Sequence, residues 1–142
     1  MLGQRLAQRL SETNIRVVTA ESCTAGLLGA CIAAAPGSSS ILEGSFIAYR
    51  PTMKTDALGV SAALIGEKTV YDPHVARAMA EGALRGATGA DLAIAITGVG
   101  GPNPDQGKPV GLVYIATLHR GGTAQVTECH FKGGNPHHSK PF

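Results

Sequence analysis

Hydrophobic and polar positions follow two different periods along this chain of 142 residues. Near the N-terminus, leucines spaced by four, with charged and amide side chains between them, predict an amphipathic helix over residues 2–10. The β-branched run Ile15–Ala20 then predicts a buried strand. An Ala- and Leu-rich stretch over residues 24–35 predicts a second helix, which Pro36-Gly37 ends.

Helix-like and strand-like hydrophobic patterns alternate along the rest of the chain. Strands that alternate with helices predict an α/β fold, here a three-layer α/β/α sandwich with a mixed sheet. Two strands joined by Gly121-Gly122 predict a C-terminal antiparallel hairpin. We assign residues 1–131 to a single domain and residues 132–142 to an irregular tail. The remaining predicted elements are strands at 43–49, 91–96, 110–118 and 124–131, and helices at 51–58, 60–65 and 73–86.

Composition and charge exclude several classes of protein but do not indicate a particular function. An apolar fraction of 44% and a charged fraction of 15% are typical of a globular protein. A net charge of +2, with scattered basic residues, does not indicate nucleic-acid binding. No apolar stretch has the length of a membrane span, and the N-terminus lacks the apolar centre of a signal peptide. We therefore expect a cytoplasmic protein with no membrane partner.

Neither cysteine nor histidine spacing indicates a metal site. Cys23, Cys31 and Cys129 are odd in number and far apart, which predicts reduced thiols and no disulfide framework. His137-His138 has no third ligand at a suitable spacing, so we expect no metal.

The turn Glu21-Ser22-Cys23-Thr24 is the first candidate for chemistry. It joins a strand to a helix, where backbone N–H groups and the helix dipole favour an anion or a developing oxyanion. Capping the helix needs only one of the two hydroxyls. A second hydroxyl, a thiol and a carboxylate exceed that need, and favour a functional turn.

A glycine-rich loop, Thr97 to Pro102, follows a later strand and is the second candidate. Its backbone can approach a ligand closely, although it lacks the spacing of a Walker or dinucleotide motif. Because ligands of open α/β sheets bind beyond the carboxyl ends of strands, we expect this loop and the Glu21–Thr24 turn to face one crevice. The Ser38–Ser40 run is interpreted as a solvated loop or helix cap, or as a source of hydroxyls for a phosphate.

With these residues in view, the chain resembles the C-terminal domain of the CinA (competence/damage-inducible) family, whose stand-alone members include nicotinamide-nucleotide amidases. The resemblance covers roughly Leu2 to Phe131, with its motifs in family order. The matching segments are Thr19–Gly26, Pro36–Ser39, Gly44–Tyr49 with Lys54, Ala78–Leu84, Ala93–Gly98 with Gly101-Pro102, and Lys108–Gly111.

This resemblance implies hydrolysis of the carboxamide of nicotinamide mononucleotide to nicotinic acid mononucleotide and ammonia. It implies a homodimer, a small nucleotide substrate, and no metal or other cofactor. Ser22 would be the nucleophile, Lys54 its base and Tyr49 a supporting hydroxyl, with amides at the start of the 24–35 helix as the oxyanion hole. A lysine can act as the base for a serine only if burial or nearby positive charge lowers the lysine pKa. Substrate-binding residues would be Cys23, Thr24, Gly26, Ser38, Ser39, Thr97, Gly98 and Gly100.

Three features depart from the family pattern. Ala25 stands where relatives usually have Gly, and Arg50–Met53 replaces a more polar stretch. After Phe131 the chain lacks the usual Arg-containing turn and final helix, for which Lys132 or Lys140 is a candidate substitute. The departures keep two alternatives open. One is a catalytically impaired member that binds a nucleotide or a protein partner, and the other is a different amidase or nucleotide hydrolase on the same scaffold.

Overall fold

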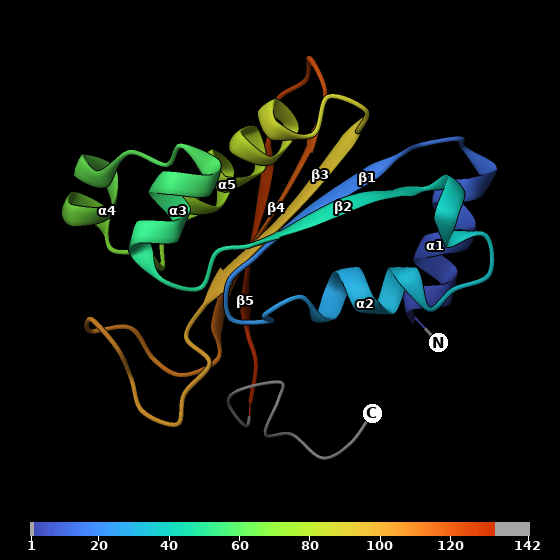
Figure 1. Ribbon diagram of the computed structural model, residues 1–142. Coiled ribbons are helices and arrows are strands. Elements are labelled where there is room, and N and C mark those ends of the chain that lie inside the picture. Colours follow the sequence, from blue (N-terminus) through green and yellow to red (C-terminus); the bar gives the residue numbers. More distant parts are fainter. Residues whose placement is uncertain (1, 133–142) are drawn as a thin grey trace.

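A five-stranded mixed sheet, in the order β2-β1-β3-β4-β5, forms the centre of the protein (Figure 1). The computed structural model describes residues 2–132, so His137, His138, Lys140 and most of the predicted tail lie outside the described residues. The first three strands are parallel, and β4 and β5 form the predicted antiparallel hairpin. The strands are β1 (Val17–Glu21), β2 (Leu42–Ile47), β3 (Leu92–Gly98), β4 (Leu112–His119) and β5 (Gln125–His130).

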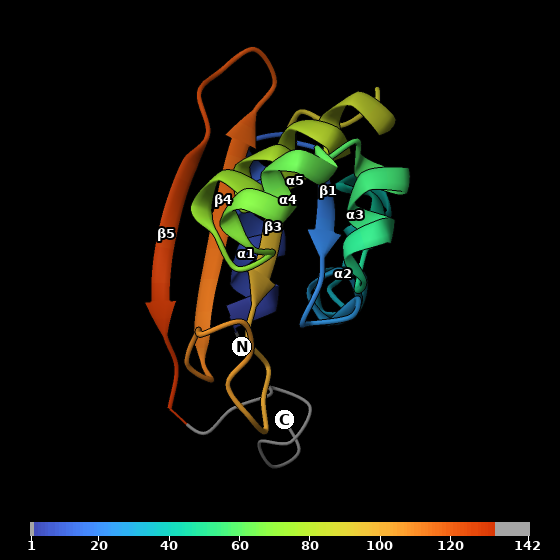
Figure 2. The same ribbon diagram turned by 90° about the vertical axis from the view of Figure 1, so that its left-hand side faces the viewer.

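Helices cover both faces of the sheet, which confirms the predicted three layers (Figures 1 and 2). On one face lie α1 (Leu2–Glu12) and α2 (Leu27–Ala33), followed by a short 3-10 turn, η1 (Ser38–Ser40). On the other face lie α3 (Pro51–Leu58), α4 (Ala62–Lys68) and α5 (Pro73–Gly86). No helix within residues 2–132 has the length and apolar character needed to cross a bilayer.

The burial of β1 and β3 explains why their sequences are nearly continuous apolar runs. Every residue of β1 and of β3 is buried, because each strand packs against helices on both faces. Alternate residues enter different cores: Val17 packs with α1 and α2, and Val18 packs with α5. In the structure β3 runs two residues further than predicted, since Thr97 and Gly98 continue the pairing with β4.

Gly82 of α5 lies against the end of α3, where a side chain would collide with the carbonyl oxygen of Leu58. We expect Gly82→Ala to lower the free energy of unfolding by about 2 kcal/mol, although alanine is the better helix former. The matched control is Gly66→Ala in α4, whose added methyl meets nothing within 4 Å. In that variant the free energy of unfolding is expected to rise by up to about 1 kcal/mol. Urea denaturation of both variants measures the difference, and equal stabilities would contradict this account of the packing.

Candidate active site

Three segments meet beyond the carboxyl ends of the parallel strands. The turn that carries Ser22 leaves β1, the segment that leads into α3 leaves β2, and the glycine-rich loop leaves β3. The Ser22 N–H donates to the Ile96 carbonyl at 3.0 Å, and the Ala48 N–H donates to the Glu21 carbonyl at 2.8 Å. The turn is therefore held between the two neighbouring strands.

Ser22 and Lys54 are in direct contact, although 32 residues separate them in the chain. The Lys54 Nζ lies 2.8 Å from the Ser22 Oγ and also donates to the carbonyls of Ala48, at 2.9 Å, and Tyr49, at 3.3 Å. Pro51 begins α3, and Lys54 lies one turn later, so its side chain extends back toward the strand ends. The lysine side chain is among the largest that are fully buried, with 1% exposure.

Burial changes the acid–base chemistry of this lysine. It lowers the pKa of Lys54 from its ordinary value of 10.5 to about 8, and the nearby Cys23 opposes the shift. The two carbonyls, of Ala48 and Tyr49, fix two N–H directions of the amine. When the amine is neutral, its lone pair is left to face Ser22. The geometry thus prepares Lys54 to accept a proton from the serine hydroxyl.

Glu21, fully buried, organises the turn around Ser22. Its carboxylate accepts hydrogen bonds from three backbone N–H groups and two threonine hydroxyls. These donors are the N–H groups of Gly26, Leu28 and Gly29 and the hydroxyls of Thr19 and Thr24, at 2.6–3.2 Å. Neither Ser22 nor Thr24 caps the helix, and α2 begins at Leu27, not at Thr24. Glu21 does the capping from within β1.

This arrangement limits which amides of the predicted 24–35 helix could form an oxyanion hole. The amides at the start of α2 already donate to Glu21, so they are not available to a substrate. The N–H groups of Cys23 and Thr24 lie earlier in the turn and close to the Cys23 sulfur. Burial raises the pKa of that thiol, and these two N–H groups partly oppose the rise. They are the donors nearest to Ser22 in the sequence.

A polar pocket of about 390 Å³ opens at Ser22. It contains residues of the Ser22 turn and of the glycine-rich loop, which confirms that the two face one crevice. Its lining comprises Ser22, Cys23, Tyr49, Pro51, Val70, Tyr71 and the stretch from Gly98 to Gln106. A neighbouring apolar pocket of about 300 Å³ shares Cys23, Val99 and Gly100 and is also lined by Thr24.

Four of the predicted substrate-binding residues lie outside the lining of both pockets. The hydroxyl of Thr97 is buried and donates to the Val70 carbonyl at 2.9 Å. The N–H of Gly26 donates to Glu21, and a side chain at Gly26 would meet that of Ile47. Ser38 and Ser39 lie in η1, because α2 returns the chain to the other end of the sheet before this turn (Figure 1).

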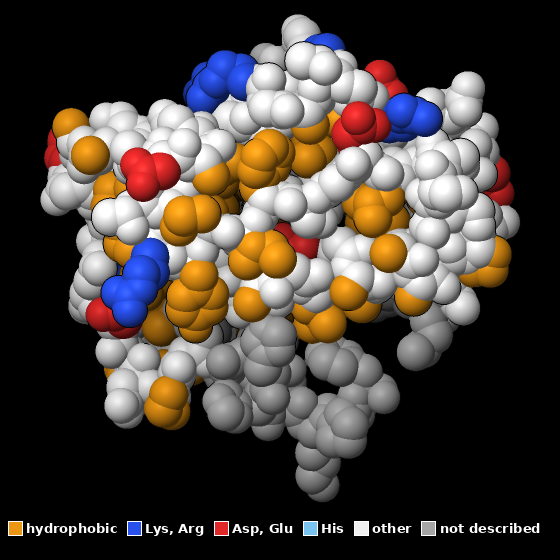
Figure 3. Space-filling view, viewed as in Figure 1, with side chains coloured by type: hydrophobic (Ala, Val, Ile, Leu, Met, Phe, Trp, Pro, Cys, Tyr) orange, Lys and Arg blue, Asp and Glu red, His pale blue; other side chains and the backbone are white. Residues whose placement is uncertain are grey.

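Tyr49 lies at the site, but the contact differs from the predicted one. Its carbonyl, not its hydroxyl, binds Lys54, and its side chain is 62% exposed while lining the pocket. Ile47 and Met53, close to Tyr49 in the sequence, are also exposed, and Figure 3 shows several apolar side chains on the face that it views. The surface next to the pocket is therefore partly apolar.

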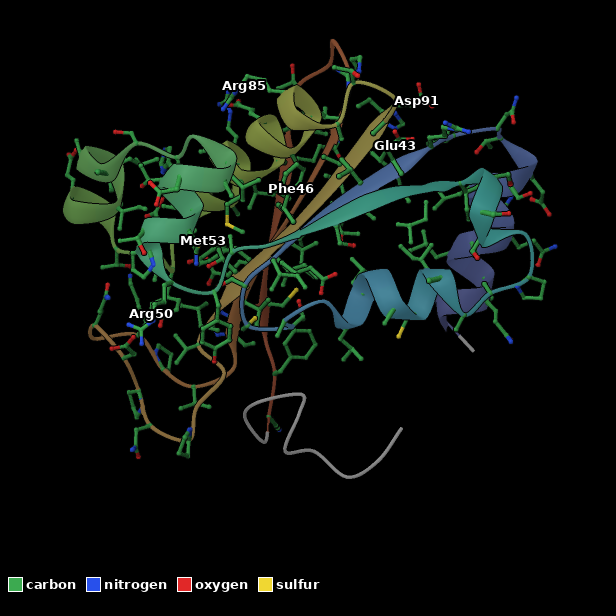
Figure 4. The ribbon with its side chains drawn as sticks, in the orientation of Figure 1. Glu43, Phe46, Arg50, Met53, Arg85 and Asp91 are labelled. Carbon is green, nitrogen blue, oxygen red and sulfur yellow. The ribbon has the colours of Figure 1, made fainter. Side chains whose placement is uncertain are left out.

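Two of the departures from the family pattern now have a physical description. Ala25 has φ of 49°, in the left-handed region that favours glycine. Arg50, which precedes α3, and Met53, in its first turn, are exposed and are labelled in Figure 4, while the Lys54 side chain is buried. The altered stretch thus preserves the buried lysine.

Tyr71 and Asp105 are site residues that sequence reasoning missed. Both line the pocket, and the Tyr71 hydroxyl donates to the Asp105 Oδ2 at 2.6 Å. An aromatic residue before a helix cap and an aspartate in a polar loop carry no signal by themselves. Among residues 2–132, no group of three histidine, cysteine or acidic side chains is placed to hold a metal ion.

The fold and the site define a three-layer α/β protein with a buried serine–lysine pair at the carboxyl end of the parallel strand β1. Comparison with known proteins then identifies the family. The model of the CinA C-terminal domain matches residues 1–140, so the chain belongs to the CinA C-terminal domain family.

Relatives and solved structures agree with this assignment. A CinA-like protein of Citrifermentans bemidjiense is 43% identical over 93% of this chain, and one of Mycobacterium tuberculosis is 49% identical over 75%. The chain spans only 32% and 25% of these two relatives. A CinA superfamily protein from Escherichia coli has a TM-score of 0.88 at 35% identity, covering 94% of this chain and 77% of that one. The competence/damage-inducible protein of Agrobacterium tumefaciens has a TM-score of 0.85 at 34% sequence identity, and the match covers 92% of this chain and 79% of that one.

Proposed function

We propose that this protein is an amidohydrolase that releases ammonia from the carboxamide of nicotinamide mononucleotide. The contact between the Lys54 amine and the Ser22 hydroxyl carries the proposal, because it joins a nucleophile to a base. The resemblance to nicotinamide-nucleotide amidases supplies the substrate, and the pocket at Ser22 has a volume within the range of small-ligand sites.

In the first half of the reaction, the Ser22 Oγ attacks the carboxamide carbon and its proton passes to the Lys54 Nζ. The carbonyl oxygen becomes an oxyanion, which hydrogen-bond donors around Ser22 would have to stabilise. The C–N bond then breaks, and Lys54 returns the proton to the departing nitrogen as ammonia. An ester between Ser22 and the nicotinate group remains.

Water completes the cycle by the same route. A water molecule attacks the ester carbon while Lys54 accepts its proton, and the bond to the Ser22 Oγ breaks. The lysine returns the proton to the serine oxygen, and nicotinic acid mononucleotide leaves as a carboxylate once its acid proton has passed to solvent water or to the released ammonia. Each step uses one proton acceptor that is alternately neutral and charged, which suits an amine with a pKa of about 8.

Activity is expected to rise with pH as Lys54 loses its proton. Below pH 8 the amine of the free enzyme is mostly protonated and is no base, so kcat/KM should fall about tenfold per pH unit; above pH 8 it should level off. A pH profile of ammonia release measures this, with exposed Lys68→Met as the control that should leave the profile unchanged. A rise centred near 10.5, the ordinary lysine value, would contradict the buried-base mechanism.

Ammonia release from nicotinamide mononucleotide by the purified protein is the direct test. Release supports the proposal. Binding of the nucleotide without release would favour the catalytically impaired alternative, and release from other amides only would favour a different amidase on this scaffold.

A further inference from the structure

One wall of the pocket includes Val70 and Tyr71, which belong to a segment, residues 69–71, held in place by three contacts. Thr69 has φ of 73°, which is unusual for a β-branched residue. Its hydroxyl accepts the N–H of Tyr71 at 3.2 Å, and the buried Thr97 hydroxyl donates to the Val70 carbonyl at 2.9 Å. The strained backbone is thus fixed from both sides, and it presents Tyr71 to the pocket.

The third contact joins this wall to the glycine-rich loop. The Tyr71 hydroxyl donates to Asp105 at 2.6 Å, and burial, followed by Asp105, raises the pKa of Tyr71, so that the phenol stays neutral and keeps donating. Asp105 and Lys108 exchange backbone hydrogen bonds at 2.8 and 3.1 Å, which closes the loop into a tight turn. The Asp105 carboxylate is therefore held at the wall, and does not swing freely in solvent.

Asp105 carries a negative charge at this wall, while the Lys54 amine, charged below about pH 8, contacts Ser22 elsewhere in the lining. Among the described residues that line the pocket, Asp105 is the one with a formal charge. The lining also contains the amides of Asn103 and Gln106 and the rings of Tyr49 and Tyr71, and aromatic faces attract cations. A phosphate would be repelled here, whereas a flat ring with a positive charge would meet both aromatic surface and a carboxylate.

We propose that the Tyr71–Asp105 pair selects substrates whose amide-bearing ring is cationic, an N-substituted pyridinium, over those with an uncharged ring. The inference rests on the proposed function and deepens it by assigning ring recognition to two residues outside the serine–lysine pair. The positively charged ring of nicotinamide mononucleotide fits this description. Its reduced dihydropyridine form carries the same carboxamide, ribose and phosphate but has no charge on the ring.

Binding of these two ligands separates recognition from chemistry. In the Ser22→Ala background, which prevents turnover, we expect the oxidised nucleotide to bind about tenfold more tightly than the reduced one. Adding Asp105→Asn should weaken the oxidised nucleotide until the preference falls to about twofold or less, and leave the reduced one nearly unchanged. Calorimetric titration gives both dissociation constants.

Two further variants make the result specific. Tyr71→Phe keeps the ring and removes the hydrogen bond to Asp105, so it should retain part of the preference. Glu67→Gln in α4 changes the net charge equally at an exposed residue outside the pocket lining and should retain all of it. Asp105 is exposed, so its replacement should leave the melting temperature unchanged.

The inference is overturned if Asp105→Asn weakens both ligands by the same factor or alters neither. Its failure is distinct from that of the proposed function. Ammonia release with an unaltered ring preference in Asp105→Asn would reject only the ring assignment, whereas the expected loss of preference without ammonia release would support ring selection and reject only the amidase.

Discussion

Ser22→Ala is expected to lower ammonia release by at least about a thousandfold while the protein stays folded. The substitution removes the hydroxyl oxygen that the Lys54 amine contacts at the pocket, so no covalent intermediate can form on it. The cost in stability is small, on the order of 1 kcal/mol, since the lysine keeps its hydrogen bonds to the carbonyls of Ala48 and Tyr49. An ammonia assay and a thermal melt of the same preparation measure both effects.

The matched control for this experiment is Ser39→Ala. Ser39 is exposed in η1, at the opposite end of α2 from Ser22, so its loss should leave turnover unchanged. Unchanged turnover in Ser22→Ala would rule out the serine nucleophile. Reduced turnover in Ser39→Ala would show that η1 reaches a substrate in a way that a single chain does not reveal.

Glu21→Ala is expected to lower the free energy of unfolding by about 3–5 kcal/mol. The buried carboxylate is the common acceptor for three backbone N–H groups and two hydroxyls, and its removal takes this acceptor away from the N–H groups of Gly26, Leu28 and Gly29. The turn that carries Ser22 and the first turn of α2 would lose their shared support. Chemical denaturation measures the change.

Glu21→Gln keeps this prediction testable if the alanine variant does not fold. The amide retains one acceptor oxygen but turns an NH₂ group toward backbone donors, so an intermediate loss is expected. Glu12→Gln on the exposed side of α1 is the control, with a change within about 0.5 kcal/mol. A Glu21→Ala protein as stable as this control would show that the hydrogen bonds contribute little.

Much of the fold could be predicted because it depends on local patterns. The spacing of leucines at the N-terminus, the apolar run before Ser22 and the glycine pair at Gly121-Gly122 each indicate one element from adjacent residues. The boundaries were less accurate where distant groups decide them. Thr97 and Gly98 join β3 because β4 pairs with them, and α2 starts late because Glu21, in a strand, supplies its cap.

Some residues of the candidate site could likewise be predicted from the sequence, and others could not. Ser22 and Lys54 were found through family motifs, and the structure places their side chains in contact. Ser38 and Ser39 were assigned to the same site, but the direction of α2 carries them away from it. Tyr71 and Asp105 come from segments that no motif marks, and only the packing of two loops brings them to one pocket wall.

By itself, the sequence determined the α/β class, the order of the elements, and the two strand-end segments where a ligand binds in such a sheet. Those properties follow from hydrophobic period and turn chemistry, which act over a few residues. Only the tertiary structure decided the state of Lys54, the acceptor for the α2 amides, and the charge on the pocket wall. Burial, hydrogen bonding and charge depend on what lies across space, and no local pattern specifies those neighbours.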